Sequence, residues 1–414
     1  MKAEAAPLTG AEFASLMAPL GPFGARPRVA VGVSGGPHSL ALAILSHDWA
    51  AALGGSAIAL IADHGLRPES GEEAEGVAAQ LAGLGIEARV LRLGLPLGAA
   101  LQERARLARR AALLEAAAGL GAPWLLLGHH RGDQAETLAF RALRGSGPAG
   151  LAGMAPLVVQ AEGLVLRPLL DVPPARLEAL LVARGVEPVR DPSNDNPRFA
   201  RVRVRQAMAD PGGTGAGVGA LAEAAAAFAR RGERARRKLA EGLLAVARPH
   251  PLGPVRLEGM PDEAVLAALI RMVTGAEHPP PRDGLRRLLG NGGGTLHGAL
   301  WAGSWVMREP AAIEPAIPAH DGALWDRRWR LDAPAGLLPG DLWGGLGEAA
   351  LRYRKLARDM PLASLQTLPA LWRDGRPIAI PALGHTDEAA LTVIGCHLLP
   401  QSGPILPLES APGT

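Results

Sequence analysis

A glycine-rich turn with flanking hydroxyls stands near the start of the chain, between an apolar run and a segment with helical spacing. Its residues are Ser34, Gly35, Gly36, Pro37, His38 and Ser39. Two glycines let the backbone turn tightly and approach a ligand, and the serines supply hydroxyl donors. A helix beginning here presents free N–H groups and its positive dipole end, which suit a pyrophosphate. No Gly-Lys-Ser/Thr of a Walker A loop follows, and a glycine pair by itself is also typical of a simple turn.

A second polar group combines two histidines and two acids: His129, His130, Asp133 and Glu136. The acids are three residues apart at the expected start of a helix, so both carboxylates share one face. Such a pair can bind Mg²⁺ or hold an ammonium group, although acids in a first helical turn also serve as simple caps. A zinc site is disfavoured because the histidines lack a third soft ligand at the usual spacing.

Short apolar runs and longer helical stretches alternate in the first half of the chain. The runs, which predict buried strands, are Arg28–Val33, Ala57–Ala62, Glu87–Leu93 and Trp124–Leu127. The helical stretches are Ser39–Leu53, Ser70–Leu84, Ala99–Leu120 and Asp133–Leu143. This order predicts an α/β fold with a Rossmann-like parallel sheet covered on both faces. Ligands bind beyond the carboxyl ends of such strands, so Ser34–Ser39, Asp63–His64 and His129–Glu136 are expected at one edge.

The composition narrows the class of protein. A chain of 414 residues is long enough for two or three domains, and one cysteine, Cys396, excludes an internal disulfide or an all-thiolate metal site. Glu4 and Glu12 interrupt the apolar core that a secretory signal needs, and no membrane span is expected, so the cytoplasm is the predicted location. Lysine occurs three times, so 40 of the 43 basic residues are arginines, which pair bidentately with phosphates.

The motifs together resemble a known family. Ser-Gly-Gly-x-Asp-Ser after the first strand is the signature of the PP-loop ATP pyrophosphatases, from which His38 departs because the family has Asp there. Seven further motifs follow in order: Asp63–Arg67, Glu103–Arg109, Gly128–Thr137, Arg144–Leu151, Arg167–Leu170, Asp191–Asn194 and Phe199–Arg205. Over residues 28–205 the chain therefore resembles the tRNA(Ile)-lysidine synthetase family, and more weakly beyond.

The resemblance implies a ligase reaction in tRNA processing. ATP adenylates the C2 oxygen of the wobble cytidine in the CAU anticodon of tRNA(Ile), and the ε-amine of free L-lysine displaces AMP to leave lysidine. The implied cofactors are ATP and Mg²⁺, and the expected partners are this tRNA and lysine, with no DNA and no membrane.

The resemblance also assigns residues to roles. ATP binding is expected at Ser34, Gly35, Gly36, Pro37, His38, Ser39, Asp63 and His64. Catalysis and lysine binding are expected at Arg106, His129, Asp133 and Glu136, with Asp133 also a Mg²⁺ ligand. Contact with tRNA is expected at Arg144, Ser146, Arg201, Arg203 and Arg205. The last three alternate along the chain, which is consistent with one charged face meeting the tRNA backbone.

Three regions are expected. Residues 1–210 form the ATP-binding catalytic domain, 220–310 a mainly helical tRNA-binding region, and 318–414 a small α+β domain for substrate and tRNA. The glycine-rich Pro211–Gly219 is the predicted linker. Thiolating PP-loop enzymes are excluded by the single cysteine. A non-catalytic paralogue that binds tRNA or nucleotide remains the alternative, because of His38.

Overall fold

The computed structural model describes residues 5–63, 70–93, 101–160, 162–189, 200–333, 335–387, 391 and 395–398, and the side chains of 101–107 and 200 lie outside this description. The chain divides into two compact units, Met1–Glu233 and Arg234–Thr414. The division falls within helix α9, Ala216–Val246, which begins inside the segment predicted as a linker. No described helix is both long and apolar enough to cross a bilayer.

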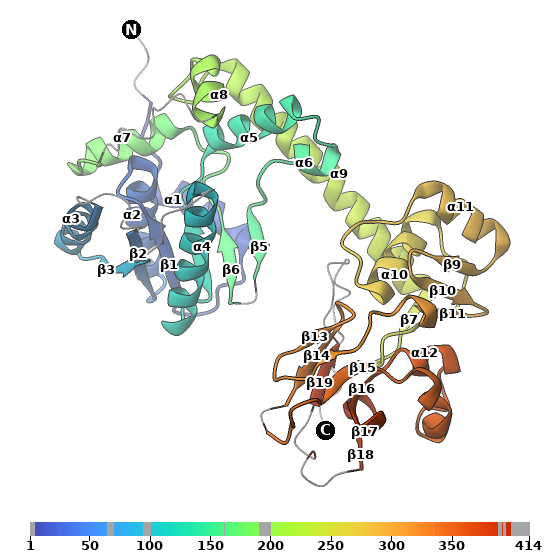
Figure 1. The fold of residues 1–414 in the computed structure, drawn as a ribbon. Helices are drawn as coiled ribbons and strands as arrows, with labels where there is room; N and C mark the ends of the chain where they lie inside the picture. The colour runs from blue at the N-terminus through green and yellow to red at the C-terminus, as the bar shows by residue number, and fades with distance from the viewer. Residues whose placement is uncertain are drawn as a thin grey trace. The chain divides into compact units, whose positions relative to one another are not determined.

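The first unit is built on a six-stranded sheet in the order β3-β2-β1-β4-β6-β5 (Figure 1). Its strands are β1 Arg28–Val33, β2 Ser56–Asp63, β3 Glu87–Arg92, β4 Trp124–Leu127, β5 Leu157–Val159 and β6 Leu164–Leu166. All neighbours are parallel except β5, which runs antiparallel to β6 at the edge. The predicted α/β class with a parallel sheet is confirmed.

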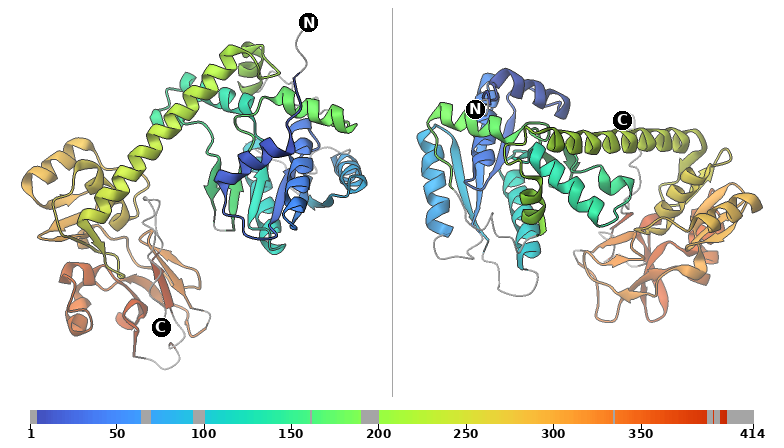
Figure 2. Two further views of the ribbon diagram at one scale, coloured as in Figure 1. Left: turned by 180° about the vertical axis from the view of Figure 1, so that it is seen from behind. Right: turned by 90° about the horizontal axis from the view of Figure 1, so that it is seen from above.

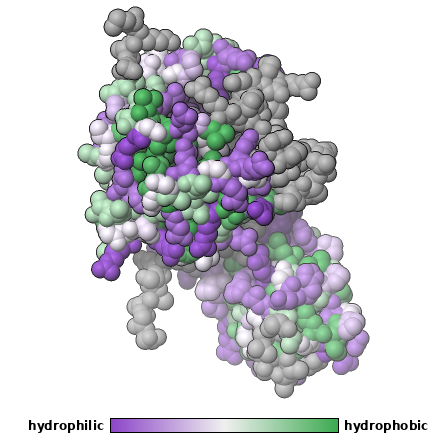
Figure 3. All heavy atoms as spheres, turned by 90° about the vertical axis from the view of Figure 1, so that its left-hand side faces the viewer, coloured by the Kyte–Doolittle hydropathy of each residue, from purple (hydrophilic) through white to green (hydrophobic). Residues whose placement is uncertain are grey.

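Helices cover both faces of this sheet. Those that pack with its strands are α1 Gly10–Met17, α2 Pro37–Ala52, α3 Ser70–Gly83, α4 Leu101–Gly119 and α7 Pro174–Arg184. The unit also contains α5 Arg131–Leu143, against which α6 Pro148–Leu151 and α8 Ala200–Met208 pack. Alternate residues of β1 point to opposite faces: Val29 and Val31 pack with α1, α2, α3 and α7, whereas Ala30 packs with α4. Figure 1 shows α4 in front of the sheet, and the reverse view in Figure 2 shows α1 and α2 on the other side. Hydrophilic and hydrophobic residues are interspersed on the outer face drawn in Figure 3.

The second unit contains antiparallel sheets. One has five strands in the order β7-β8-β11-β10-β9, at Ala247–Pro249, Val255–Leu257, Trp305–Arg308, Ala299–Ala302 and Gly294–Leu296. It packs with α10 Glu263–Thr274 and α11 Arg282–Asn291. Residues 220–310, expected to be mainly helical, thus also contain a sheet, whose strands of three or four residues are too short to show alternation.

The remaining strands form a second five-stranded sheet and a three-stranded sheet. β12 Ile317–Pro318, β15 Leu342–Gly345, β16 Pro369–Arg373, β17 Arg376–Ile380 and β18 His385–Thr386 make one, and β13 Leu324–Trp325, β14 Trp329–Asp332 and β19 Gly395–Leu398 make the other. Helix α12, Leu362–Gln366, belongs to the same part of the chain. Short 3₁₀ helices lie at Ala18–Leu20, Pro310–Ala312, Gly347–Leu356 and Pro381–Leu383.

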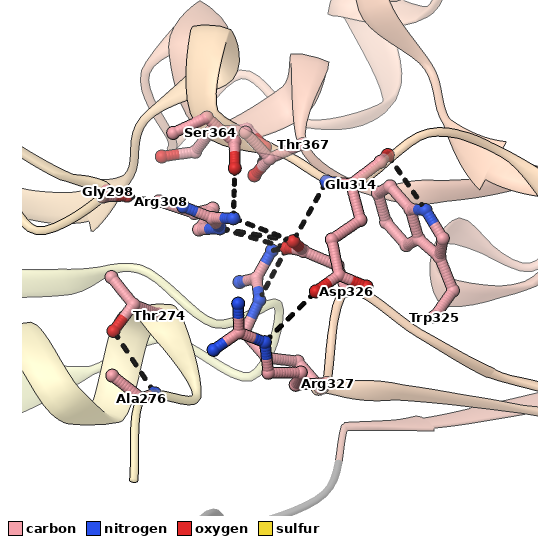
Figure 4. Close-up of polar contacts among 12 residues, drawn as sticks. Thr274, Ala276, Gly298, Arg308, Glu314, Trp325, Asp326, Arg327, Ser364 and Thr367 are labelled. Carbon is pink, nitrogen blue, oxygen red and sulfur yellow. Dashed lines mark hydrogen bonds and ion pairs between the residues drawn. The ribbon is translucent and has the colours of Figure 1, made fainter. Parts of the chain in front are cut away.

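A buried ionic cluster ties β11 to the β13–β14 turn (Figure 4). Asp326 accepts from Arg308 Nη2 at 2.8 Å through Oδ1 and from Arg328 Nη2 at 2.7 Å through Oδ2. The three side chains are at most 6% exposed. Burial opposes ionisation of Asp326, but the two guanidinium groups outweigh it and hold the carboxyl pKa below its usual value. The cluster therefore depends on one carboxylate for its charge balance.

Replacing Asp326 with Asn is expected to destabilise the second unit by about 3–5 kcal/mol, because two buried guanidinium groups lose their counter-charge. The pKa of Asp326 is depressed, so its contribution is present above the unfolded pKa of about 3.9 and is lost as pH falls through the folded value. Denaturant unfolding followed by tryptophan fluorescence measures both effects. Asp283→Asn, at a 93% exposed side chain, is the control. Equal unfolding midpoints for the two variants would contradict the assignment.

Candidate active site

The glycine-rich turn lies at the carboxyl end of β1, as expected. Gly36 is the N-cap of α2, and Pro37 occupies the first turn. Ser39 Oγ donates to Gly36 O at 2.9 Å and accepts from the backbone N–H of Ser34 at 3.1 Å. These two hydrogen bonds connect the two ends of the turn and stabilise it. Gly35 has φ +80°, and a Cβ there would lie 2.8 Å from Val77 Cγ2. Backbone geometry and packing both require glycine at position 35.

The end of β4 meets the start of α2 at Gly128. A Cβ on Gly128 would lie 3.0 Å from the carbonyl oxygen of His38 and 3.2 Å from Ser39 Cα. This close approach brings the His38 and His130 rings to 4.1 Å between centroids, at an interplanar angle of 72°. His38 Nε2 also lies 3.6 Å from Glu178 Oε1 of α7. The structure therefore brings the two predicted loops together.

His130 and Asp133 form a cap at the start of α5. The backbone N–H of His130 donates to Asp133 Oδ2 at 3.0 Å, and His130 Nε2 lies 3.4 Å from the same oxygen. Burial lowers the pKa of His130 to about 4, against the opposing charge of Asp133. Burial also opposes ionisation of Asp133, but the histidines and the His130 N–H outweigh it and hold that carboxyl pKa below its usual value. At neutral pH the pair is a neutral imidazole beside a carboxylate.

Glu136 lies one turn further along α5 and pairs with Arg205 of α8. Arg205 Nε donates to Oε1 at 2.5 Å and Nη2 to Oε2 at 3.2 Å, which is bidentate geometry. The carboxylate is 6% exposed, whereas the guanidinium side chain is 44% exposed. Burial raises the pKa of Glu136 even though Arg205 pulls it down.

The expectation that Arg201, Arg203 and Arg205 share one charged face is wrong. These residues belong to helix α8, not to an extended strand, so alternate positions diverge around the axis. Arg201 and Arg205 are one turn apart and share a face, and Arg203 projects elsewhere. A spacing of two places side chains on one face of an extended strand, whereas these positions lie on a helix.

The other predicted site residues are placed as follows. Asp63 ends β2, and its Oδ1 accepts from Ser70 Oγ at 2.7 Å. His129 is half-buried before α5, and Arg144 caps the other end of that helix with its guanidinium 5.0 Å from the Phe140 ring centroid. Ser146 donates its backbone N–H to Arg141 O at 3.0 Å. His64 and the motif Asp191–Asn194 lie outside the described residues, and Arg106 lies on α4 with its side chain outside the description.

Two residues that the sequence analysis did not single out support the site. Gln134 Nε2 donates to Met154 O at 2.9 Å, and Gln134 Oε1 accepts from Met154 N at 2.7 Å. Arg141 Nη1 donates to the carbonyls of Gly150 at 2.7 Å and Gly153 at 2.8 Å. Both residues attach the segment after Ser146 to α5, which carries Asp133 and Glu136. Gln134 lies within the Gly128–Thr137 motif, but the sequence does not predict that its amide bonds to a backbone segment.

The site combines a glycine loop, placed between a parallel strand and a helix N-terminus, with carboxylates that follow the neighbouring strand. This is the arrangement of a PP-loop nucleotide-binding domain, and the PP-loop domain family matches residues 10–211. Relatives named tRNA(Ile)-lysidine synthase extend the match. The protein of Methylobacterium sp. (strain 4-46) is 45% identical over 274 residues, 65% of this chain and 77% of that protein. The protein of Methylobacterium nodulans is 42% identical over 303 residues, which are 68% of this chain and 86% of that protein.

The chain belongs to the tRNA(Ile)-lysidine synthase family, whose members are ATP-dependent ligases of tRNA processing. The PP-loop match lies within the first unit. The protein of Hyphomonas neptunium is 49% identical over 187 residues, which are 44% of this chain and 50% of that protein.

The pKa of His130 predicts a pH dependence of stability. Its folded value of about 4 lies below the unfolded value of about 6.5, so the neutral form stabilises the fold fully above pH 6.5. That contribution, at most about 3 kcal/mol, is lost as pH falls from 6.5 towards 4. His130→Gln should flatten this part of the curve, as measured by denaturant midpoints between pH 7.5 and 4. A wild-type curve that is already flat in this window would show that the imidazole is not desolvated.

Proposed function

We propose that this chain joins lysine to the wobble cytidine of tRNA(Ile) bearing a CAU anticodon, which changes codon reading from AUG to AUA. The observation that carries the proposal is the junction at Gly128, where the Ser34–Ser39 turn and the start of α5 meet. An anion site and a carboxylate site stand side by side there. Membership of the lysidine synthase family supports the same reaction.

The reaction takes two steps. The cytidine O2 attacks the α-phosphorus of ATP, an O–P bond forms, and pyrophosphate leaves. The ε-ammonium of lysine gives up one proton to water, and the neutral ε-amine then attacks C2. The C2–O bond breaks, AMP leaves with that oxygen, and the nitrogen loses a second proton to water. The N-terminus of α2 and the hydroxyls of Ser34 and Ser39 hold phosphate oxygens. Asp133 and Glu136 accept from the lysine ammonium, and Arg106 is assigned to phosphate or to the lysine carboxylate.

Mg²⁺ fits the site only in part. Position 38, where the family has a carboxylate, offers an imidazole, and hard Mg²⁺ prefers oxygen. Among the described residues, no group of three or more His, Cys, Asp or Glu side chains is arranged to hold a metal ion. Asp133 would be the ligand that the site supplies to an ion that accompanies ATP. The charge of such an ion would offset that of the phosphates.

The regions after the catalytic domain are assigned to tRNA. Residues 1–210 carry the chemistry, and 220–310 and 318–414 hold the tRNA body, as does the loop of Arg144 and Ser146. The exposed arginines of Arg230–Lys238 on α9 suit phosphate contacts, so binding should weaken steeply with salt. The cytoplasm is the proposed location.

The direct test supplies labelled lysine, ATP and tRNA(Ile) with a CAU anticodon to the full chain. Lysine should become covalently attached to this tRNA and not to one with a GAU anticodon. Asp133→Asn and Glu136→Gln should each reduce the rate about 100-fold, on the scale of losing one preorganised electrostatic group. Asp171→Asn, at an exposed carboxylate of the same unit, should retain the wild-type rate. ATP and tRNA binding without any product would favour the non-catalytic paralogue.

His38→Asp tests the departure from the family signature. A carboxylate at this position adds an oxygen ligand beside the phosphate turn, so the rate at low Mg²⁺ should rise about tenfold. The uncharged variant His38→Asn should produce no such gain in rate. If His38→Asp leaves the rate and the Mg²⁺ requirement unchanged, position 38 has no part in metal binding.

A further inference from the structure

The carboxylate assigned to the lysine ammonium is paired with an arginine from another helix. Both oxygens of Glu136 accept from the Arg205 guanidinium. A lysine that enters this position must therefore compete with a bidentate ion pair. The two partners differ in access, because Glu136 is 6% exposed and Arg205 is 44% exposed.

We infer that the Arg205 guanidinium occupies the Glu136 carboxylate until tRNA binds. The guanidinium then leaves, and the lysine ammonium takes its place on the carboxylate. This inference rests on the proposed function, in which Glu136 binds lysine. The guanidinium moves from the carboxylate to a backbone phosphate of the tRNA, which offers the same bidentate geometry. Arg205 thus couples the binding of one substrate to the binding of the other.

Charge balance favours replacement of the guanidinium by the ammonium over simple breaking of the Glu136–Arg205 ion pair. Burial raises the pKa of Glu136, so the ionised carboxylate is costly without a cation beside it. An ammonium group that arrives as the guanidinium leaves keeps the buried charge compensated. Breaking the pair with nothing to replace it would leave a buried charge unpaired or force protonation.

The geometry of α8 allows the exchange by side-chain movement. Helix α8 packs against α5, and Val202 of α8 is buried, at 8% exposed. Arg201 lies one turn before Arg205 on the same face, is exposed, and acts on Glu136 only through charge. The helix backbone can therefore stay in place while the exposed Arg205 side chain rotates outward. Arg201 also adds positive charge on the side from which a phosphate would approach.

The test measures lysine affinity on the full chain by equilibrium dialysis of labelled lysine, with and without tRNA(Ile) and in the absence of ATP. In the wild type, tRNA should tighten lysine binding about tenfold, within the usual range of coupling between sites. Arg205→Gln should bind lysine about tenfold tighter than wild type without tRNA, and tRNA should then add less than about twofold. The measurements are made near pH 8, where Glu136 is more readily ionised.

Three variants act as controls. Arg184→Gln removes an exposed arginine of α7 whose partner is Asp48, and it should leave lysine binding without tRNA unchanged. Arg205→Lys keeps the charge but loses the bidentate fork, so its affinity should lie between those of wild type and Arg205→Gln. Glu136→Gln should weaken lysine binding, and thermal unfolding of each variant checks that it is folded.

The possible outcomes are distinct. Weaker lysine binding in Arg205→Gln would show that Arg205 supports the lysine site instead of occupying it, which overturns the inference. Unchanged binding in Arg205→Gln with weaker binding in Glu136→Gln also overturns it, but leaves the proposed role of Glu136 intact. Unchanged binding in Glu136→Gln would remove that role and the inference together.

Discussion

The missing side chain at Gly128 is the constraint on which the site depends. A Cβ on Gly128 would lie 3.0 Å from the carbonyl oxygen of His38, so β4 and the first turn of α2 would have to move apart by a few tenths of an ångström. The contact places the phosphate turn and the start of α5 on the same edge of the sheet. The edge-on contact of His38 with His130 and the cap between His130 and Asp133 both follow from it.

Much of the first unit was predictable because its apolar residues follow clear strand and helix patterns. Strands β1 and β4 match their predicted bounds, and α2 and α3 begin or end within about two residues of theirs. The three-residue strands β5 and β6 were not predicted, because runs so short carry no alternation. In the second unit the strands are short and are determined by their pairing with distant segments. The local sequence pattern therefore predicts few of them.

The site was predictable in position but not in its pairings. Parallel strands put their carboxyl ends at one edge, so the order of motifs was enough to bring Ser34–Ser39 and His129–Glu136 together. The partner of Glu136 is 69 residues away in the chain, on helix α8, where the expected single face of alternating arginines does not form. The same limit applies to Asp326, since its pairing with Arg308 spans two sheets of the second unit. Both units neutralise a buried carboxylate with guanidinium groups, which agrees with a chain in which 40 of 43 basic residues are arginine.

The attachment of residues 150–154 to α5 has a consequence for how this chain can vary. Surface loops usually tolerate insertions and deletions well. Here the contacts of Gln134 and Arg141 go to backbone atoms of Gly150, Gly153 and Met154. These contacts fix the number of residues between the anchors, and two of the anchors also fix the residue type. Gly153 has φ +68°, and a Cβ there would lie 2.6 Å from Gln134 Oε1, whereas a Cβ on Gly150 would lie 2.8 Å from Ser146 Cβ. A single inserted residue would move the carbonyl groups out of register with both donors, so this segment should keep both its length and its two glycines.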